Sequence, residues 1–314
     1  MTEIPVISSE AVFAAIDPRA AIERTREAFE RYGRSEWTMP AKVYLDSPPY
    51  GDFRAMPALG NDIALLKWVT SFPGNSAKGL PVVRGEVLLS DAETGEEMAV
   101  IECSSVTSLR TGAAAAVSAQ VLAADGARSV GIIGCGVNGA WAARCLAAAG
   151  YGPGVCADPR VDPAEALADE LGWRAGDRGE AAAQDVVVTV TPGEELVILD
   201  SDLRPGQHLA VLGADAHGKQ EVDLEAIKRS RLFCDEWEQA SAGGELANAF
   251  GAGVIKRDDV TQLGDVLNGG PGRAADEEIT LFDSTGLAIQ DLAICKAVYD
   301  RWREGALEAP VVRL

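Results

Sequence analysis

The stretch Val130-Gly131-Ile132-Ile133-Gly134-Cys135-Gly136-Val137-Asn138-Gly139 decides the fold of this chain. Its first four residues form an apolar run typical of a buried strand, and a helical pattern follows at residues 138–149. Gly134 would permit a tight turn, Gly136 would let the backbone approach a pyrophosphate, and Gly139 would let the helix pack on the strand. The pattern predicts a dinucleotide-binding turn, with a glycine-rich turn that binds nothing as the alternative.

Strands and helices alternate beyond this turn. Apolar runs of strand length lie at 155–157, 185–190, 208–212 and 232–234, and Asp162-Pro163 is expected to cap a helix that Gly172 ends. This alternation predicts a parallel sheet with right-handed crossovers. We therefore expect a Rossmann-type, doubly wound domain over residues 113–285.

The residues before the turn predict an α+β domain over residues 1–112. A helix is expected from Asp17-Pro18 to Gly33, followed by strands at 42–45, 53–56, 63–69 and 82–89. An alanine-rich helix from Ser104 to near Gly126 either joins the two domains or is a plain core helix. The last long element, at about 286–303, is expected to be helical, and the C-terminal helical segment 286–314 is expected to join the first domain.

Composition excludes several classes of protein. The 314 residues carry 48 acidic side chains against 28 Lys and Arg, a formal charge of −20, which disfavours nucleic acid and anionic membranes as partners. No uninterrupted apolar run is long enough to span a membrane, and Met1-Thr2-Glu3-Ile4-Pro5 lacks the pattern of a signal peptide. Six separated cysteines without a Cys-x-x-Cys pair favour a reduced, cytoplasmic protein.

Two further compositional features bear on function. His208 and His217 lack metal-ligand spacing, so no metal site is expected. Among the basic residues, 21 are Arg and only 7 are Lys. Excess acid with scarce lysine suits a surface kept soluble in high salt, because screening weakens self-repulsion, and we hypothesise a halophilic source.

Asp158 lies at the end of the second strand of the predicted parallel sheet, where an acidic residue binds the adenosine ribose hydroxyls of NAD. A 2′-phosphate would be repelled there, so NAD is favoured. Arg160 could still accept that phosphate, which leaves NADP as the alternative; Asp158 could also be a plain turn residue before Pro159.

Charged residues mark the candidate chemistry. Asp215 follows a predicted parallel strand, at the sheet edge where ligands bind, although Asp is also common in glycine-rich turns. Lys67 interrupts the apolar run Leu65-Leu66-Lys67-Trp68-Val69 and is either an acid/base group or an edge-strand lysine that discourages aggregation. Lys42 and Arg54 lie on or beside neighbouring strands. Arg110 either clamps a carboxylate or phosphate or simply lies at the start of a helix.

Several segments also match a known family in order and spacing over about residues 39–293. They are Met39-Pro40-Ala41-Lys42-Val43-Tyr44-Leu45, Gly51-Asp52-Phe53-Arg54-Ala55-Met56-Pro57-Ala58, Leu66-Lys67-Trp68-Val69, Leu109-Arg110-Thr111-Gly112-Ala113-Ala114, the glycine motif, the Asp215 segment with Lys219-Gln220-Glu221, and Phe282-Asp283-Ser284-Thr285-Gly286. Together they resemble the ornithine cyclodeaminase/mu-crystallin family, and within it the archaeal-type alanine dehydrogenases.

The resemblance implies a homodimer whose first domain carries the substrate and dimer surfaces and whose second domain binds NAD(P). It implies that Lys67 is the catalytic acid/base, that Asp215 activates water or the amine, and that Lys42, Arg54, Lys67 and Arg110 bind the substrate. The residues expected at the cofactor are Arg110, Thr111, Gly134, Gly136, Val137, Asn138, Gly139, Asp158, Pro159, Arg160, Gly213, Ala214 and Ser284.

Position 54 bears on the choice of reaction. Cyclodeaminases resemble Glu-x-Met-Pro where this chain has Arg54-Ala55-Met56-Pro57. A guanidinium repels the distal ammonium of ornithine and attracts a carboxylate, which favours a dehydrogenase for a small amino acid. The chain departs from that branch at Thr70, Ser71 and Gly74, so the side-chain pocket differs from the usual pattern.

The sequence therefore predicts an NAD-dependent dehydrogenase that interconverts a small L-amino acid with its 2-oxo acid and ammonia, alanine and pyruvate being the favoured pair. The first alternative is ornithine cyclodeamination or imine (ketimine) reduction, including a step of ectoine breakdown. The second is a mu-crystallin-like, dinucleotide-dependent binding protein.

Overall fold

The computed structural model describes residues 3–193 and 195–313 and divides into two compact units. The first unit comprises residues 1–110 and 287–314, and the second comprises residues 111–286. The division falls within the long helix α3 (Cys103–Leu122). Met1 and Thr2, which belong to the segment examined for a signal peptide, lie outside the described residues.

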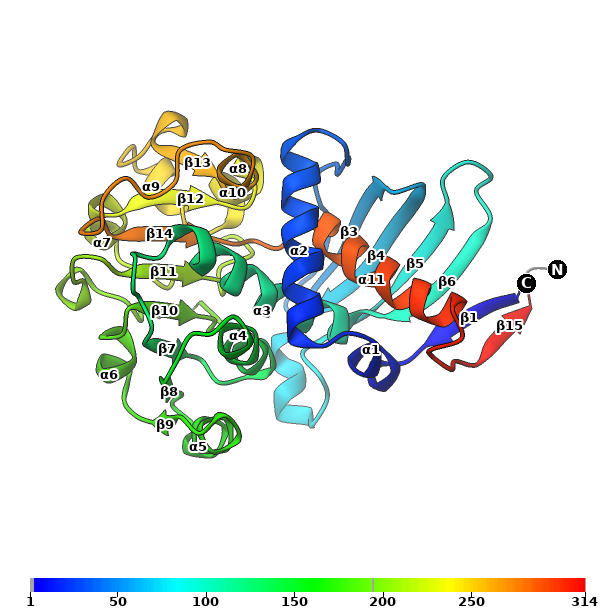
Figure 1. Ribbon diagram of the computed structural model, residues 1–314, viewed down its shortest axis with the longest axis horizontal. Coiled ribbons are helices and arrows are strands. Elements are labelled where there is room, and N and C mark those ends of the chain that lie inside the picture. Colours follow the sequence, from blue (N-terminus) through cyan, green and yellow to red (C-terminus); the bar gives the residue numbers. More distant parts are fainter. Residues whose placement is uncertain (1–2, 194, 314) are drawn as a thin grey trace. The chain divides into compact units, whose positions relative to one another are not determined.

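A seven-stranded sheet forms the first unit, in the order β15-β1-β6-β5-β4-β3-β2 (Figure 1). Its strands are β1 (Glu3–Ile7), β2 (Val43–Ser47), β3 (Gly51–Gly60), β4 (Ile63–Ser71), β5 (Val83–Asp91), β6 (Glu97–Glu102) and β15 (Val311–Arg313). The helices of this unit are α1 (Ser9–Ala15), α2 (Pro18–Gly33) and α11 (Ala288–Arg303), with the 3-10 turn η1 (Pro73–Lys78) after β4. Figure 1 shows α11 crossing one face of the sheet over β3 and β4, beside α2.

Alternation along the strands gives the sheet of the first unit one buried face. In β4, Ile63, Leu65, Lys67 and Val69 are buried, while Leu66 and Trp68 between them are exposed. Because successive side chains of a strand point to opposite faces, the buried set packs beneath α11.

The helix expected over about 286–303 is confirmed as α11, but residues 311–313 of the wider C-terminal segment 286–314, also expected as helix, form a strand. Helix α11 ends at Arg303, and Gly305 has φ +73°, a left-handed conformation that stops a helix. The β-branched pair Val311-Val312 then forms β15, which pairs antiparallel with β1. Neither β1 nor β6 was expected from the sequence.

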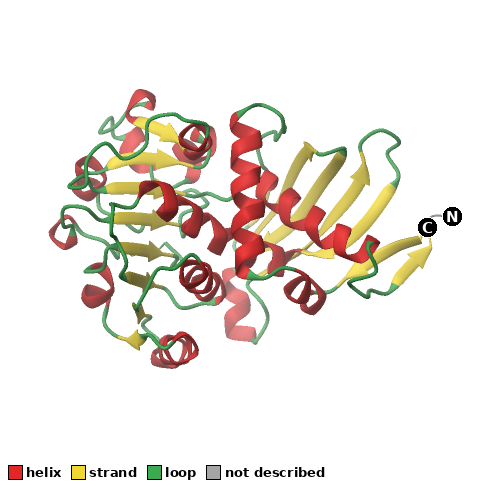
Figure 2. Ribbon diagram, in the orientation of Figure 1, coloured by secondary structure: helices red, strands yellow, loops and turns green. Residues whose placement is uncertain are grey.

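The second unit is built on an eight-stranded, all-parallel sheet in the order β13-β12-β14-β11-β10-β7-β8-β9. Its strands are β7 (Val130–Ile133), β8 (Gly154–Ala157), β9 (Arg174–Ala175), β10 (Val186–Thr189), β11 (His208–Val211), β12 (Arg231–Cys234), β13 (Val260–Gln262) and β14 (Thr280–Asp283). Helices flank this sheet (Figure 2): α4 (Val137–Ala148), α5 (Val161–Leu171), α6 (Arg178–Ala182), α7 (Leu224–Arg229), α8 (Trp237–Gly243), α9 (Ala247–Gly251) and α10 (Leu263–Leu267). The strand order reverses between β7 and β10, which is the doubly wound arrangement expected from the sequence.

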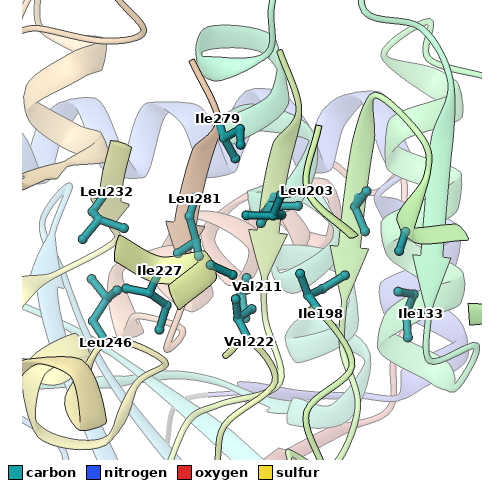
Figure 3. Close-up of a cluster of buried hydrophobic side chains, with 14 of the residues drawn as sticks. Ile133, Ile198, Leu203, Val211, Val222, Ile227, Leu232, Leu246, Ile279 and Leu281 are labelled. Atoms are coloured by element: carbon teal, nitrogen blue, oxygen red, sulfur yellow. The ribbon is translucent and has the colours of Figure 1, made fainter. Parts of the chain in front are cut away.

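Buried β-branched and leucine side chains hold the parallel sheet to its helices. The four residues of each of β7, β8, β10, β11 and β14 are all buried, as expected for strands covered on both faces. Figure 3 shows part of this core, where Val211, Ile227 and Leu281 lie close together. The carboxyl ends of β7, β8, β10, β11 and β14 continue into loops.

The expected ends of α5 are confirmed at one end only. Gly172 ends α5 in the left-handed conformation, as expected, but Asp162 is not its cap, because Arg160 occupies the N-cap position and Asp162 lies in the first turn. Helix α3 packs closely on α4: a Cβ on Gly112 would come within 2.4 Å of the Trp141 backbone. The small residues of α3 therefore serve a close helix contact.

Candidate functional site

Lys67 lies on the buried face of a central strand. Strand β4 pairs with β3 on one side and β5 on the other, and the Lys67 side chain is only 1% exposed. The interpretation of Lys67 as an edge-strand lysine is therefore wrong. A buried ammonium is costly unless it is paired and hydrogen-bonded, so its partners decide what it can do.

The partners of Lys67 come from two helices. Its Nζ donates to Asp291 Oδ1 at 2.8 Å and to Thr107 Oγ1 at 2.6 Å. Asp291, on α11, is fully buried, and Nε of Arg110, on α3, lies 3.5 Å from the same oxygen. Neither Arg110 Nε nor Asp291 Oδ2 has a hydrogen-bond partner among the described residues. Two cations thus share one carboxylate, which leaves a net positive charge and unused hydrogen-bonding capacity.

Arg54 lies on the same face of the sheet as Lys67. Strand register places Arg54 opposite Val69 and Met56 opposite Lys67, so Arg54 and Lys67 are diagonal neighbours. The Arg54 guanidinium is 5.3 Å from the centre of the Tyr44 ring. Lys42, half-buried, immediately precedes β2. The structure thus brings Lys67, Arg110 and Arg54 to one face of the first unit.

Asp291 was missed by the sequence interpretation. It stands in Leu287-Ala288-Ile289-Gln290-Asp291-Leu292-Ala293-Ile294, where it interrupts an apolar run as Lys67 does. Two opposite charges, each within an apolar run, are a signal for a buried ion pair. Because the two residues are 224 positions apart in the sequence, local patterns cannot detect the pairing.

The glycine turn after β7 has the geometry that a dinucleotide needs. Gly134 has φ +100°, and a Cβ on Gly139 would lie 1.9 Å from the Gly134 carbonyl oxygen, so both positions require glycine. A Cβ on Gly136 would meet nothing within 4 Å, which leaves the start of α4 open to a ligand. Val137 is exposed and Asn138 half-buried at that helix start. These residues fit the pyrophosphate of NAD.

Asp158 follows β8 and contacts the glycine turn directly. Its Oδ2 accepts from the Cys135 backbone N–H at 2.8 Å, and Arg160 donates to both carboxylate oxygens, at 3.0 and 3.2 Å. Burial alone would raise the pKa of Asp158, but the hydrogen bonds from Arg160 and Cys135 outweigh it and lower the pKa. Asp158 is therefore a fixed anion beside the turn, as a ribose-binding acid should be, and the adjacent Pro159 is exposed.

Asp215 lies in the loop after β11. Its Oδ1 accepts from Lys219 Nζ at 2.6 Å, and both side chains are about one-third exposed. The loop is held from beneath by Glu221, which accepts from Thr191 N at 2.7 Å and from Gly213 N at 2.8 Å. Glu221 thus joins the ends of β10 and β11 and supports Asp215.

A set of buried acids continues along the carboxyl edge of the sheet. Glu245 accepts from the backbone N–H groups of Glu221 and Val222, and Asp235 accepts from Ser284 Oγ at 3.2 Å and Gly286 N at 2.8 Å. Burial, reinforced by repulsion from Glu221, raises the pKa of Glu245 to about 8. Burial, together with the charge of Asp235, raises the pKa of Asp283 well above its usual range. We infer that these carboxyls order the cofactor-side loops.

Other expected cofactor-side residues are buried. Thr111 on α3 is 5% exposed, Ala214 is 1% exposed, and Ser284 after β14 is 4% exposed. The Ser284 backbone N–H donates to Val211 O of the neighbouring β11. Ala214 and Ser284 therefore follow the adjacent strands β11 and β14, whereas Thr111 belongs to helix α3, which precedes the sheet in the sequence.

One of the two histidines belongs to the core. His208 is fully buried between Ser118 Oγ and Thr280 Oγ1, and burial lowers its pKa to about 3. Within residues 3–193 and 195–313, no group of three or more His, Cys, Asp or Glu side chains is arranged to hold a metal ion. No helix in these ranges combines the length and apolar character needed to cross a membrane.

The chain is similar to known proteins along most of its length. The family model described as "Ornithine cyclodeaminase/mu-crystallin family" matches residues 5–150 and 167–306. An alanine dehydrogenase of Archaeoglobus fulgidus is 40% identical, with 95% of each chain covered. An iminosuccinate reductase of Paracoccus denitrificans is 36% identical, over 94% of this chain and 95% of that one. A solved archaeal alanine dehydrogenase dimer with bound NAD has a TM-score of 0.95 and 38% identity, with 100% of both chains covered.

Proposed function

Because the chain belongs to the ornithine cyclodeaminase/mu-crystallin family, we propose that it is an NAD-dependent dehydrogenase interconverting a small L-amino acid with its 2-oxo acid and ammonia. Alanine and pyruvate are the favoured pair. The observation that carries the proposal is the buried group in which Lys67 and Arg110 share Asp291, leaving one positive charge for one substrate carboxylate. The 40% identity to an alanine dehydrogenase supports the same pair.

The cofactor is NAD. The open approach at Gly136 and the fixed carboxylate of Asp158 fit its pyrophosphate and adenosine ribose, and a solved relative binds it. Arg160 is engaged by Asp158, so a 2′-phosphate would have to compete with that carboxylate. NAD supplies hydride exchange at the substrate α-carbon.

The residues of the chain manage charge and protons. Arg110 would bind the substrate carboxylate, and the Lys67 ammonium would donate a proton to the carbonyl or carbinolamine oxygen during amination and take it back in the reverse direction. Asp291 and Thr107 orient that ammonium. Asp215 would accept a proton from the attacking water or ammonium, and Lys219, which donates to its Oδ1, would orient it.

A homodimer is the assembly we propose. On the face of the sheet opposite Lys67, the register groups Val43, Leu45, Leu66, Trp68 and Leu88, all exposed. Trp68 stacks on Phe53 with ring centres 5.6 Å apart. A contiguous apolar surface of this kind is characteristic of an interface, and the solved archaeal relative is a dimer. We also propose a cytoplasmic location, since all six cysteines are free and buried.

Reduction of a preformed imine is the second candidate. It requires the same hydride and proton transfers without attack by ammonia, and an iminosuccinate reductase is among the relatives. The two functions differ in whether free ammonium is consumed.

Product analysis of the purified protein tests the proposal. We would incubate it with NADH, ammonium and pyruvate, with NADH and Δ1-pyrroline-2-carboxylate, and with NAD and ornithine, and follow the absorbance of NADH. Ammonium-dependent formation of alanine is expected. Formation of proline from the cyclic imine alone would establish imine reduction, and proline from ornithine would establish cyclodeamination. NADH binding without any turnover would favour a binding protein.

Variants locate the chemistry. Lys67→Ala should lower turnover by about three orders of magnitude or more while NADH still binds, because the proton donor is lost. Lys228→Ala removes an exposed lysine of α7 and serves as the matched control. Near-normal turnover of Lys67→Ala would refute the assignment.

A further inference from the structure

Asp52 forms a bidentate ion pair with Arg54 on the sheet face that carries Lys67. Arg54 Nε donates to Asp52 Oδ1 at 2.6 Å and Nη2 donates to Oδ2 at 3.2 Å. The arginine side chain is 9% exposed and the aspartate side chain 20% exposed. Being two residues apart in β3, both side chains project from the same face. A partly desolvated guanidinium thus has a carboxylate from its own strand along one edge.

The pair lies within reach of a substrate held at Lys67. Diagonal neighbours on adjacent strands are about 7–8 Å apart, and Arg54 stands in that relation to Lys67. A substrate whose α-carboxylate is held at Lys67 and Arg110 can extend its side chain toward Arg54. The group at position 54 would then contact that side chain.

Charge differs between the two ends of this face. Lys67, Arg110 and Asp291 together carry one net positive charge, whereas Arg54 and Asp52 together carry none. A second substrate carboxylate would meet an ion pair instead of a bare cation. Asp46, exposed and directly across from Asp52 on β2, adds further negative charge at this end.

We propose that Asp52 is a specificity-determining residue: by neutralising Arg54, it makes the enzyme select substrates whose side chain carries no carboxylate. This inference rests on the proposed function and refines its substrate class to monocarboxylic 2-oxo and amino acids. Arg54 by itself favours anionic side chains, so its aspartate partner removes the preference that the arginine predicts from sequence.

The test compares Asp52→Asn with Asp46→Asn. Both variants remove one negative charge, but only position 52 is hydrogen-bonded to Arg54 in the interactions described above, and an amide at 52 keeps an acceptor for the guanidinium. We would measure kcat and KM for pyruvate and for oxaloacetate with ammonium and NADH. The oxaloacetate-to-pyruvate ratio of kcat/KM should rise at least about tenfold in Asp52→Asn, the change lying in the KM for oxaloacetate. In Asp46→Asn it should change less than about threefold, because solvent screens an exposed charge.

A binding measurement separates this inference from the proposed function. The affinities of the NADH complex for propionate and for succinate should follow the same rule, with Asp52→Asn binding succinate more tightly and propionate unchanged. If the wild type aminates neither oxo acid, the proposed function fails and the binding ratio still decides the role of Asp52. An unchanged ratio in Asp52→Asn, or equal losses for both acids, would overturn the inference and leave Asp52 a purely structural partner of Arg54.

Discussion

Replacing Asp291 by asparagine should strongly destabilise the first unit. The carboxylate is fully buried and lies 2.8 Å from an ammonium that is 1% exposed. At an effective dielectric constant of about 20, unit charges at that separation attract by about 6 kcal/mol. Asparagine keeps a hydrogen-bonding oxygen but leaves Lys67 and Arg110 without a counter-charge, so we expect a loss of about 3–5 kcal/mol in the free energy of unfolding.

Urea unfolding, followed by tryptophan fluorescence, measures this loss. The matched control is Asp300→Asn on the same helix, where the partner Lys296 is about one-third exposed and the loss should stay below about 1 kcal/mol. The double variant Lys67→Met/Asp291→Asn should be more stable than Asp291→Asn by about 2 kcal/mol, because one buried, uncompensated cation has been removed.

Two results would refute this reasoning. If Asp291→Asn unfolds within about 1 kcal/mol of the wild type, the buried charges are not coupled as the geometry requires. The single variant Lys67→Met is measured as well. If its loss and that of Asp291→Asn simply add in the double variant, Lys67 and Asp291 act independently.

Three other substitutions and one change of solvent extend the test. Glu245→Gln should reduce the pH dependence of the free energy of unfolding. The pKa of Glu245 is raised to about 8, so the contribution of its proton to stability is full at acidic pH and is lost as the pH rises through 8. Thermal melts from pH 5 to 9 should therefore show a smaller decline in melting temperature in the variant than in the wild type. Gly136→Val should fold normally but weaken NADH binding at least about tenfold in a fluorescence titration, since the added side chain occupies open space at the turn; a stable variant with unchanged affinity would contradict the site. Trp68→Glu should yield monomers in sedimentation, and persistence of the dimer would exclude this face. Removal of salt should unfold the protein if its acidic surface is adapted to high salt, whereas equal melting temperatures at low and high salt would dismiss that hypothesis.

The local pattern predicted five strands of the parallel sheet, β7, β8, β10, β11 and β12, but it did not predict β9, β13 or β14. The apolar run at Val130, the glycine spacing and the stop at Gly172 each act within a few residues, and the strand, turn and helix formed where these signals stand. The family resemblance, which rested on short segments in a fixed order, is confirmed by the match of the family model along the chain. Signals that act between distant residues were weaker: the pairing of β15 with β1 was not predicted.

Arg54 shows why residue type alone was insufficient at the site. As a lone cation it predicts attraction for a carboxylate, but the structure places Asp52 against it. Both residues were visible in the sequence, only two positions apart. Whether they pair depends on the strand conformation and on the burial that makes the pairing worthwhile, and neither is a property of the two residues themselves.

The sequence by itself determined the class of the fold, the glycine turn and the identity of the charged residues available for chemistry, because periodicity and turn propensity are local properties of the chain. The tertiary structure alone decided which of those charges meet. Asp291 contacts Lys67 at a sequence separation of 224 positions, and Glu221 joins the ends of two strands beneath Asp215. Such contacts form because a buried charged group loses its water and is costly unless another group pairs with it. The partner can come from any part of the chain that folds beside it, so the pairing cannot be derived from sequence neighbours.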